Sequence, residues 1–446
     1  MSTRLVFCPP PCKSAFQRAA FLGLLEPGRT RLSVHLPEFA PGLGRDARAA
    51  LRVVNALGAE VIHELTGPGM GDIVIQSHGW VRPSGGSLAC GESATTARFV
   101  LALLAGLGGD ARLEAEPQLA RREVGDSVVH TLESLGCDFD WMGEPGCFPM
   151  RIASVGGDDP LDLRIDTSHT SQAASGLLMV LARRGGRLVI DGPPGYAPLT
   201  AAWLRRFGVA LEMDVCSRHA EFFVTRNLRE SDRAVFVPGD PSAASFFLAW
   251  SASCGVSAEV RGLGDLRDGP EAFHPDIGFL GDLEAIGVSC QHDESALRID
   301  PARGSVPSST SAASPIDLSD RPDCVAPLVA LLSTLPGRHA LRSAKLRHKE
   351  SDRLTVLARG LRLLGFAAVD TGDTLVFEGR VPQAQPETIE GTLETAGDHR
   401  MAMAFATLAS IHRLRVRLDD EDCVDKSFPG FHRELRRWEA ARRTLS

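Results

Sequence analysis

An excess of positive charge is missing from this sequence. Lysine and arginine number 48 against 56 aspartates and glutamates, which gives a formal net charge of −8. A protein whose main task is to bind nucleic acid normally carries a basic surplus, so the balance disfavours that class and predicts no nucleic-acid partner. Anionic small molecules remain suitable ligands, because a local cluster of cations can act against a negative background.

Long apolar runs are also missing. No uncharged apolar stretch reaches the ~18 residues that a membrane-spanning helix needs. The first residues, MSTRLVFCPPPCK, do not place a positively charged region before a long apolar run, so no signal peptide is expected. These absences predict a cytoplasmic protein without a membrane partner.

Metal-ligand spacing is absent from the ten cysteines. The closest pair, Cys8 and Cys12, forms a CxxxC spacing that is a weak signal on its own. In a reducing compartment free thiols mostly act as small hydrophobic side chains. The sequence therefore predicts no metal site and no cofactor.

What the 446 residues do contain is a repeat. Six short polar starts lead into apolar helices rich in small residues, beginning at positions 13, 93, 171, 242, 323 and 399. The steps between them are 80, 78, 71, 81 and 76 residues. A second helix ends in an apolar residue and glycine at Leu57-Gly58, Leu135-Gly136, Phe207-Gly208, Ile286-Gly287 and Leu364-Gly365. Two independent markers with one period predict six copies of a unit of roughly 75 residues.

Strand-like runs lie between these helices: DIVIQ, RLVID, AVFVP, ALRID and TLVFE. The first helix of each copy is apolar nearly all round, which predicts that it is buried. Six copies with so long a period do not suit a solenoid. An α/β fold of two globular domains, with three units each, is therefore expected. The stretch 301–315, PARGSVPSSTSAASP, is predicted to be a mobile loop.

The polar helix starts are candidate anion sites. The first N–H groups of a helix lack internal partners, and the helix dipole makes that end positive. Several such ends in one cleft would bind a phosphate or a carboxylate. The alternative for any single Ser or Thr is a helix cap. The candidate starts carry cations or polar side chains: Lys13-Ser14, Thr95-Thr96, Thr170-Ser171-Gln172 and His399-Arg400.

One short stretch, LRHKESDR at 346–353, concentrates charge of both signs. Six of its eight side chains can carry charge, including Lys349, Glu350 and Arg353. Mixed-charge runs usually form a solvated helix face. The alternative is a site that binds an anion and moves a proton.

Four stretches carry a resemblance to a known family: LRHKESDRL, GDHRMAMAFA, VPGDPSAASFFLAW and KSFPGF. In these motifs, and from PPCKSAFQRAAFLGLL to CVDKSFPGFHREL, the chain resembles the enolpyruvyl transferases, most closely the EPSP synthase family. The resemblance implies a monomer with a two-domain, inside-out α/β fold. Each domain would hold three βαβαββ units, with the active site in the interdomain cleft. One domain would span 12–236, and the other would combine 1–11 with 237–446.

The resemblance also implies a reaction and its ligands. The enolpyruvyl group of phosphoenolpyruvate would be transferred to a hydroxyl of a phosphorylated acceptor, with release of phosphate and without a metal or cofactor. Phosphoenolpyruvate would be bound by Lys13, Ala94, Thr95, Arg122, Gln172, Arg353, Arg400 and Lys426. The acceptor would be bound by Ser14, Arg18, Thr170, Ser171, Asp323, Lys345 and Lys349.

Two carboxylates are expected to move the protons. Asp323 would take the proton of the acceptor hydroxyl as it attacks C2, and Glu350 would protonate C3, because nearby cations orient carboxylates and set their pKa. The tetrahedral intermediate would then expel phosphate. Lys13 and His399 complete the expected catalytic set. Taken alone, Asp323 is also a plausible helix cap, and His399 a satisfied helix-start histidine.

The chain departs from the family pattern mostly on the acceptor side. Glu92 stands where Asn is usual, Ala94 where Gly is usual, and Glu123 where Pro is usual. Pro193 replaces a serine that binds the acceptor phosphate, and it offers no side-chain donor. Lys345 replaces an Asn that holds the shikimate ring. The hypothesis is an acceptor other than shikimate 3-phosphate, with the ribose hydroxyl of a nucleotide such as UMP as a candidate.

Other interpretations stay open. A genuine EPSP synthase of the shikimate pathway, or a specialised enzyme of antibiotic biosynthesis, would each fit the motifs. A relative of UDP-N-acetylglucosamine enolpyruvyl transferase is disfavoured by the KESDR pattern. A catalytically inactive, anion-binding relative is favoured by Glu92 and Pro193 but opposed by the retained Asp323 and Glu350. An RNA-end-processing relative lacks the interleaved aromatic and basic residues that such binding uses.

Overall fold

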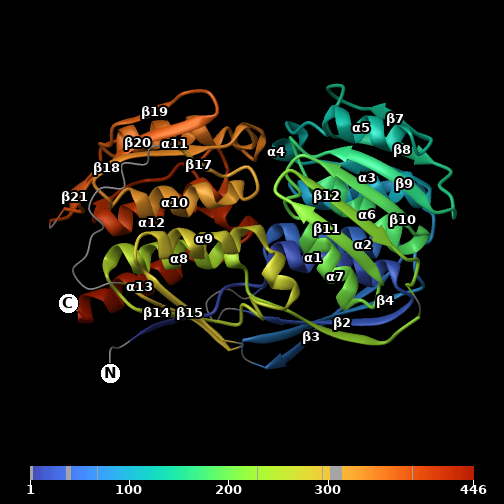
Figure 1. Ribbon diagram of the computed structural model, residues 1–446, viewed down its shortest axis with the longest axis horizontal. Coiled ribbons are helices and arrows are strands. Elements are labelled where there is room, and N and C mark those ends of the chain that lie inside the picture. Colours follow the sequence, from blue (N-terminus) through green and yellow to red (C-terminus); the bar gives the residue numbers. More distant parts are fainter. Residues whose placement is uncertain are drawn as a thin grey trace.

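The computed structural model describes residues 4–36, 42–67, 69–228, 230–293, 295–301, 314–383 and 385–445. The predicted loop at 301–315 lies mostly outside the described residues. The chain forms two lobes, seen on the right and left of Figure 1, and each lobe has its own hydrophobic core.

The first lobe has a core drawn from residues between Cys12 and Val237. Its helices are α1 (Lys13–Leu25), α2 (Arg45–Ala56), α3 (Ala94–Leu107), α4 (Pro117–Ala120), α5 (Asp126–Glu133), α6 (Gln172–Arg184) and α7 (Ala197–Arg206). Its strands are β2 (Gly28–His35), β3 (Glu60–Gly67), β4 (Met70–Ser77), β5 (Ser84–Ala89), β6 (Gly109–Glu114), β7 (Cys137–Trp141), β8 (Met150–Ser154), β9 (Leu161–Asp166), β10 (Gly186–Asp191), β11 (Leu211–Cys216), β12 (His219–Val224) and β13 (Arg233–Val237).

The second lobe has a core that joins Leu5 and Phe7 to residues between Ala243 and Trp438. Its α-helices are α8 (Pro241–Cys254), α9 (Phe279–Ala285), α10 (Val325–Leu332), α11 (Arg353–Leu363), α12 (His399–His412) and α13 (Phe431–Leu445). Five 3₁₀ helices are η1 (Pro270–Phe273), η2 (Pro275–Gly278), η3 (Pro322–Cys324), η4 (Ala344–His348) and η5 (Asp422–Lys426). Its strands are β1 (Leu5–Phe7), β14 (Ala258–Arg261), β15 (Ser289–His292), β16 (Ala296–Asp300), β17 (Ile316–Asp317), β18 (Gly337–Arg342), β19 (Ala368–Asp370), β20 (Thr374–Gly379), β21 (Glu387–Thr388) and β22 (Leu414–Arg415).

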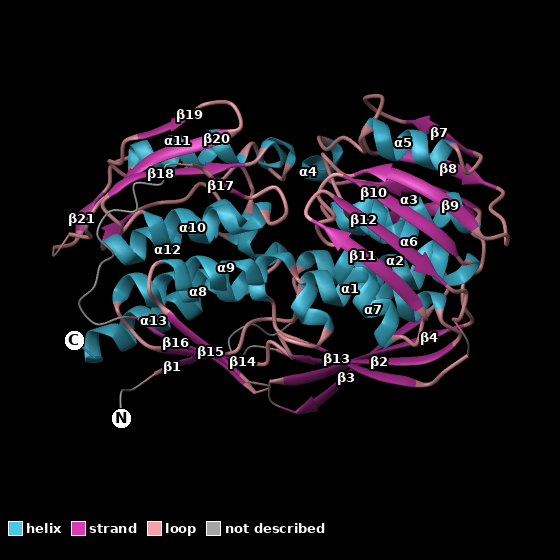
Figure 2. Ribbon diagram, in the orientation of Figure 1, coloured by secondary structure: helices cyan, strands magenta, loops and turns pink. Residues whose placement is uncertain are grey.

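Five four-stranded sheets share one pairing pattern. In the sheet β11-β12-β10-β9, for example, β9 pairs parallel to β10, β10 pairs antiparallel to β12, and β12 pairs antiparallel to β11. A parallel pair needs a crossover connection, and α6 supplies it between β9 and β10. The sheets lie on the outside of each lobe and most helices lie inside (Figure 2). The order βαβαββ thus recurs along the chain.

The inner helices are the small-residue helices of the sequence repeat. In α1 every residue from Ala15 to Leu25 is buried, and α3 is buried along nearly its whole length. In the second lobe α8, α10 and α12 pack against one another. The strand-like runs of the sequence fall in β4, β10, β13, β16 and β20. The predicted α/β fold is confirmed, and the expected helices and strands lie where the repeat placed them.

Two segments cross between the lobes side by side. Pro11 forms an antiparallel bridge with Gly239, the Cys12 N–H donates to the Pro238 carbonyl at 2.7 Å, and the Asp240 N–H donates to the Pro10 carbonyl at 2.8 Å. Because of this crossing, β1 pairs with β14 of the second lobe, and β13 pairs with β2 of the first. We propose that the two lobes are the two expected domains, 12–236 and 1–11 with 237–446.

Among the described residues, no helix is both long and apolar enough to cross a lipid bilayer. All ten cysteines are free thiols.

Candidate active site

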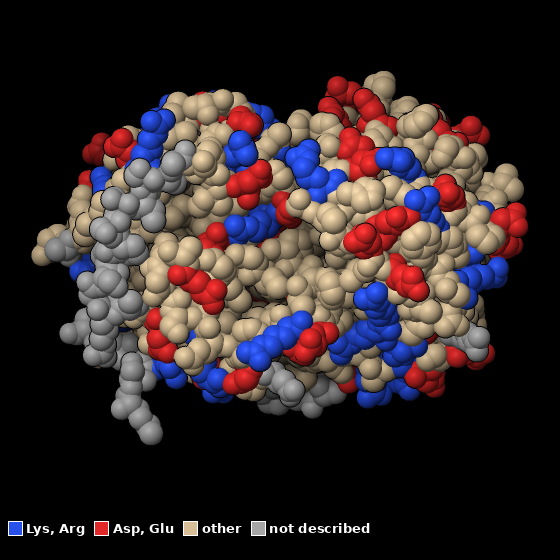
Figure 3. Space-filling model, in the orientation of Figure 1, with Lys and Arg blue, Asp and Glu red and all other residues tan. Residues whose placement is uncertain are grey.

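A pocket lies between the two lobes and draws its lining from both. Its empty space is about 850 Å³, including the solvent at its mouth. Figure 3 shows a depression between the lobes in the middle of this face, with basic and acidic side chains beside it. The pocket brings together most of the residues that the sequence singled out: Lys13, Ser14, Arg18, Ala94, Thr95, Arg122, Thr170, Ser171, Gln172, Asp323, Lys345, Lys349 and Glu350.

Three buried helices begin at this pocket. The helices α1, α3 and α6 start at Lys13, Ala94 and Gln172, and all three first residues line it. Side-chain bonds fix two of these starts to each other: the Gln172 side-chain amide donates to the Thr95 hydroxyl at 2.9 Å, and Arg98 donates to the Gln172 carbonyl oxygen at 2.7 Å. The positive ends of helix dipoles that converge on one pocket favour an anionic ligand there.

Arg18 organises the first-lobe wall of the pocket. It is 2% exposed and donates to the hydroxyls of Thr200 (2.7 Å) and Ser175 (2.9 Å) and to the carbonyl of Tyr196 (3.1 Å). Burial lowers its pKa to about 10, which still leaves the guanidinium charged at neutral pH. Arg18 therefore offers a fixed positive charge beside Tyr196 and Ser14.

Arg353 joins the carboxylates of the second-lobe wall. The guanidinium is 1% exposed, and its nitrogens lie 2.7 Å from Asp323 Oδ1, 2.9 Å from Glu350 Oε2 and 2.8 Å from Asp398 Oδ2. Asp323 also contacts Arg400 at 2.9 Å and Lys349 at 3.5 Å. The mixed-charge stretch is therefore a folded ion network, and its interpretation as a solvated helix face is wrong.

The network sets the charge of both candidate proton-transfer groups. Burial would raise the pKa of Asp323, but Arg400, Lys349 and Arg353 outweigh burial and hold that pKa well below its usual range. Burial acts on Glu350 in the same direction, and Arg122 and Arg353 hold its pKa well below its usual range too. Both groups are carboxylates at neutral pH, which suits a base, whereas an acid must first receive a proton.

A second group of ion pairs closes the floor of the pocket. Asp46 lies 3.1 Å from Lys13 Nζ and 3.2 Å from Lys426 Nζ. The same Lys426 ammonium donates to the Glu92 carbonyl at 2.9 Å and lies 3.5 Å from the Glu92 carboxylate. Two lysines expected to bind phosphoenolpyruvate are thus balanced by two carboxylates of the chain itself.

Four expected residues do not line the pocket itself. Arg353, Arg400 and Lys426 lie behind it, where they contact the pocket-lining carboxylates of Asp323 and Asp46. His399 is fully buried, and neither ring nitrogen has a hydrogen-bond partner among the described residues. Burial and Lys13 hold the pKa of His399 well below its usual range, so the ring is neutral. Its Nδ1 lies 3.7 Å from Asp398 Oδ1, and the catalytic role expected of His399 stays a prediction.

The structure places Asp323, which the sequence also allowed as a helix cap, and Arg122, whose neighbour Arg121 is a second arginine in the same stretch. The helix cap before α10 is Cys324, and Asp323 lies within η3 with its carboxylate in the ion network. Arg122 lies 3.5 Å from Glu350 and donates to the His348 carbonyl at 3.3 Å, whereas Arg121 is exposed. Arg122 thus links the first lobe to the second.

Several pocket residues were not expected from the sequence. Tyr196 is the only tyrosine in the chain, and its N–H donates to Ser171 Oγ at 3.2 Å. Being the single tyrosine of the sequence was the one feature that could have marked Tyr196 as a candidate site residue. The rings of His169 and His348 meet edge to face at 5.4 Å across the two lobes. The other unexpected lining residues are Asp46, Gly195, Ser319, Asp320 and Pro322.

Comparison with known proteins shows which family the chain resembles in sequence. The family model described as EPSP synthase (3-phosphoshikimate 1-carboxyvinyltransferase) matches residues 8–435. Two similar relatives, both named 3-phosphoshikimate 1-carboxyvinyltransferase, come from Thermococcus kodakarensis and Methanoculleus marisnigri. The first is 31% identical over 96% of this chain and 96% of its own, and the second is 32% identical over 97% of this chain and 95% of its own.

Solved structures share the fold. An EPSP synthase from Acinetobacter baumannii superposes with a TM-score of 0.72 at 22% identity, covering 98% of this chain and 96% of that one. The enolpyruvyl transferase NikO from Streptomyces tendae gives a TM-score of 0.68 at 15% identity, covering 98% of this chain and 94% of that one. The fold is that of the enolpyruvyl (carboxyvinyl) transferases, a class of enzymes. Within that class, this chain belongs to the EPSP synthase family.

Proposed function

We propose that the protein transfers the enolpyruvyl group of phosphoenolpyruvate to a hydroxyl of a phosphorylated acceptor by addition and elimination. The observation that carries the proposal is the pair of ionised carboxylates, Asp323 and Glu350, tied to one buried guanidinium at the edge of a pocket rich in cations. Such a pocket suits a donor that carries both a phosphate and a carboxylate.

In this proposal the donor occupies the side of the pocket near Lys13, Thr95, Arg122 and Gln172. Binding of the donor draws cations away from Glu350 and so raises its pKa toward that of a usable acid. Asp323 accepts the proton of the acceptor hydroxyl as its oxygen bonds to C2, and Glu350 delivers a proton to C3. The C2–O bond to phosphate then breaks, phosphate leaves, and loss of a C3 proton restores the double bond.

The acceptor occupies the side near Ser14, Arg18, Thr170, Ser171, Lys345 and Lys349. We propose an acceptor other than shikimate 3-phosphate, with the ribose hydroxyl of UMP as the candidate. In support, proline at 193 has no side-chain donor for an acceptor phosphate, and Pro193 itself does not line the pocket, whereas Gly195 and Tyr196 do. Lys345 adds a cation at the same side, and the rings of His169 and His348 give this end an aromatic wall.

Shikimate 3-phosphate is the second candidate acceptor. It is favoured by the relatives about a third identical along nearly their whole length, which are named for that reaction. An inactive anion-binding protein is the third candidate, favoured by the contact of Glu92 with Lys426.

The test is release of inorganic phosphate from phosphoenolpyruvate with each acceptor in turn. The proposal predicts turnover with UMP or another phosphorylated polyol and weak turnover with shikimate 3-phosphate. Efficient use of shikimate 3-phosphate would overturn the altered acceptor but keep the transfer chemistry. Absence of phosphate release with every acceptor, together with tight binding of phosphoenolpyruvate, would support the inactive relative.

A further inference from the structure

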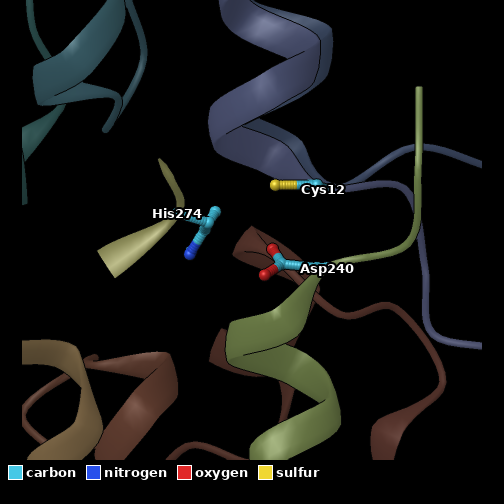
Figure 4. Close-up of side chains that lie close together, drawn as sticks. All are labelled: Cys12, Asp240 and His274. Atoms are coloured by element: carbon cyan, nitrogen blue, oxygen red, sulfur yellow. The ribbon is translucent and has the colours of Figure 1, made fainter. Parts of the chain in front are cut away.

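A second chemical cluster lies at the crossing point of the lobes, outside the pocket. Cys12, Asp240 and His274 are 1%, 4% and 2% exposed, and one ligand atom from each lies within 4.8 Å of the other two. Figure 4 shows the Cys12 sulfur and the Asp240 carboxylate pointing toward the His274 ring. Cys12 caps α1, Asp240 caps α8, and His274 separates η1 from η2.

The existing bonds leave this cluster incompletely satisfied. Cys12 Sγ accepts from the Ala15 N–H at 3.4 Å, and Asp240 accepts from the N–H groups of Ser242 (2.8 Å) and Lys13 (3.3 Å). His274 Nε2, although buried, has no hydrogen-bond partner among the described residues. Buried polar nitrogens are rarely left unpaired, so this atom indicates an absent ligand.

A neighbouring carboxylate has the same defect. Asp276 is 2% exposed, and its Oδ1 also lacks a hydrogen-bond partner in the described part of the chain. Its other oxygen accepts from the Ser242 hydroxyl and, at 3.4 Å, from Tyr196. Two unpaired polar atoms two residues apart, both buried, are what a missing cation or its bound water would satisfy.

We propose that Cys12, Asp240 and His274 form a zinc site at the crossing of the two lobes, with water as the fourth ligand. Thiolate, carboxylate and imidazole are the ligands that Zn²⁺ takes, and four-coordinate geometry is its preference. One thiolate and one carboxylate match the two charges of the ion. The transfer reaction proposed above does not require the site, although the site adjoins the pocket: Asp240 accepts from the Lys13 N–H, and the His274 ring meets the Tyr196 ring at 5.3 Å.

Loading the site changes two bonds. The Cys12 thiol loses its proton to solvent as the sulfur bonds to zinc. A neutral imidazole has one lone pair, which His274 now uses to accept from the Asp276 N–H at 3.2 Å. For zinc to bind Nε2, the unpaired nitrogen, the ring proton moves from Nε2 to Nδ1, and Nδ1 then no longer accepts from the Asp276 N–H. The three ligands belong to segments far apart in the sequence, so they form no metal-binding motif that could be recognised from residue spacing.

The direct test uses the full-length protein, stripped with a chelator under reducing conditions and titrated with Co²⁺ as a spectroscopic substitute for Zn²⁺. We expect one Co²⁺ per chain, a thiolate-to-cobalt charge-transfer band and the visible bands of four-coordinate cobalt. Absence of the charge-transfer band in the wild-type protein would overturn the proposal without any variant.

Variants assign the band to these residues. Cys12→Ser keeps a capping oxygen for the Ala15 N–H but removes the thiolate, and it should abolish the band; His274→Gln should weaken cobalt binding. Cys216→Ser, which removes an exposed thiol, is the matched control and should leave the band unchanged. Zn²⁺ should raise the Tm of the wild-type protein and of Cys216→Ser but not of Cys12→Ser. A band that persists in Cys12→Ser would mean surface binding and would overturn the site.

Discussion

Arg353 is the residue on which the charges of the pocket depend. Its guanidinium is buried and contacts Asp323, Glu350 and Asp398 at once. Removing one partner of a buried ion pair leaves the other charge without compensation, which lowers the free energy of unfolding. The two carboxylates expected to transfer protons are therefore fixed by a single shared cation. A change in the charge of one carboxylate is expected to alter the pKa of the other.

Replacing Asp323 by Asn tests its role as the base. We expect kcat to fall by about 10²–10⁴-fold, since a positioned base contributes about that much. The affinity for phosphoenolpyruvate should stay the same or rise, because Asp323 competes with this donor for Arg400. Steady-state kinetics and calorimetry separate the two effects.

Asp317→Asn is the control, because that exposed carboxylate pairs with Arg342 at 3.2 Å and does not line the pocket. A fall in kcat no larger in Asp323→Asn than in this control would exclude Asp323 as the base.

Lys345 predicts a pH dependence. Burial, aided by Lys349, lowers the pKa of Lys345 to about 8. A lysine carries its charge below its pKa and loses it above, so the acceptor phosphate should lose a partner as the pH rises through 8. We expect kcat/KM for the acceptor to fall by up to about tenfold per pH unit above that value, since this parameter reports groups of the free enzyme.

Lys345→Arg keeps its charge throughout this range and should move the fall in kcat/KM to higher pH. An identical decline in wild type and Lys345→Arg would assign the titration to another group.

The position of Glu92 predicts that its negative charge weakens the binding of phosphoenolpyruvate. Its carboxylate lies 3.5 Å from Lys426 and shares that lysine with Asp46. Glu92→Gln removes one negative charge beside an anionic ligand, so KM for phosphoenolpyruvate should fall several-fold, to about tenfold at most for a partly exposed pair. Glu114→Gln, an exposed change on β6, should leave KM unaltered. A higher KM in Glu92→Gln would show that Glu92 supports donor binding.

Many site residues were predictable from the family resemblance. Lys13, Arg122, Asp323 and Glu350 all reach the pocket, as the family resemblance implied. Asp46 was not predictable, because an acidic residue in the first turn of a helix is ordinary at the sequence level. Its partners, Lys13 and Lys426, approach it only through the tertiary fold.

At the scale of elements, close helix packing positions the starts that face the pocket. Gly176 of α6 lies against α3, and a Cβ built there would lie 2.6 Å from the Ala102 Cβ and 3.3 Å from the Arg98 carbonyl. Small residues in the repeated helices therefore allow α3 and α6 to approach. Gln172 and Thr95, at the starts of these two helices, depend on this approach for their hydrogen bond.

Gly176→Ala should push α3 and α6 apart. We expect a loss of about 1–3 kcal/mol in the free energy of unfolding, which is typical of overpacking a core, and weaker donor binding. Gly281→Ala in α9 is the matched control, because its Cβ would meet no other described heavy atom within 4 Å. That change should be neutral or stabilise by up to about 1 kcal/mol. Urea denaturation compares the two, and equal stabilities would contradict the packing argument.

The repeat predicted the positions of the repeated helices, with one difference at the start of α10. Alternating markers placed α1, α3, α6, α8 and α12 within a residue or so of their observed starts. The tenth helix begins later than expected, at Val325, because Pro322–Cys324 first forms a 3₁₀ turn that aims Asp323 at Arg353. Such a turn depends on ion pairs with segments distant in the sequence. The repeat in the sequence carries no information about these ion pairs, so it could not predict the turn.

At the scale of the whole molecule, the pocket exists only because the chain crosses between lobes twice. Lys13 follows one crossing segment directly, and Asp240 ends the other. The exchange of β1 and β13 between sheets ties each lobe to the other. The sixfold period predicted the units, whereas this exchange is invisible in the period and was implied only by the family resemblance.

The central claim is that the carboxylates and cations of this pocket carry out addition and elimination on phosphoenolpyruvate. The most direct measurement is the mass spectrum of the product formed in D₂O from phosphoenolpyruvate and each acceptor. Because C3 gains a solvent proton and later loses one, the account predicts deuterium on the vinyl carbon together with released phosphate, both formed about 10²–10⁴-fold more slowly in Asp323→Asn. A product whose vinyl carbon carries no deuterium, or phosphate release that is unchanged in Asp323→Asn, would contradict it.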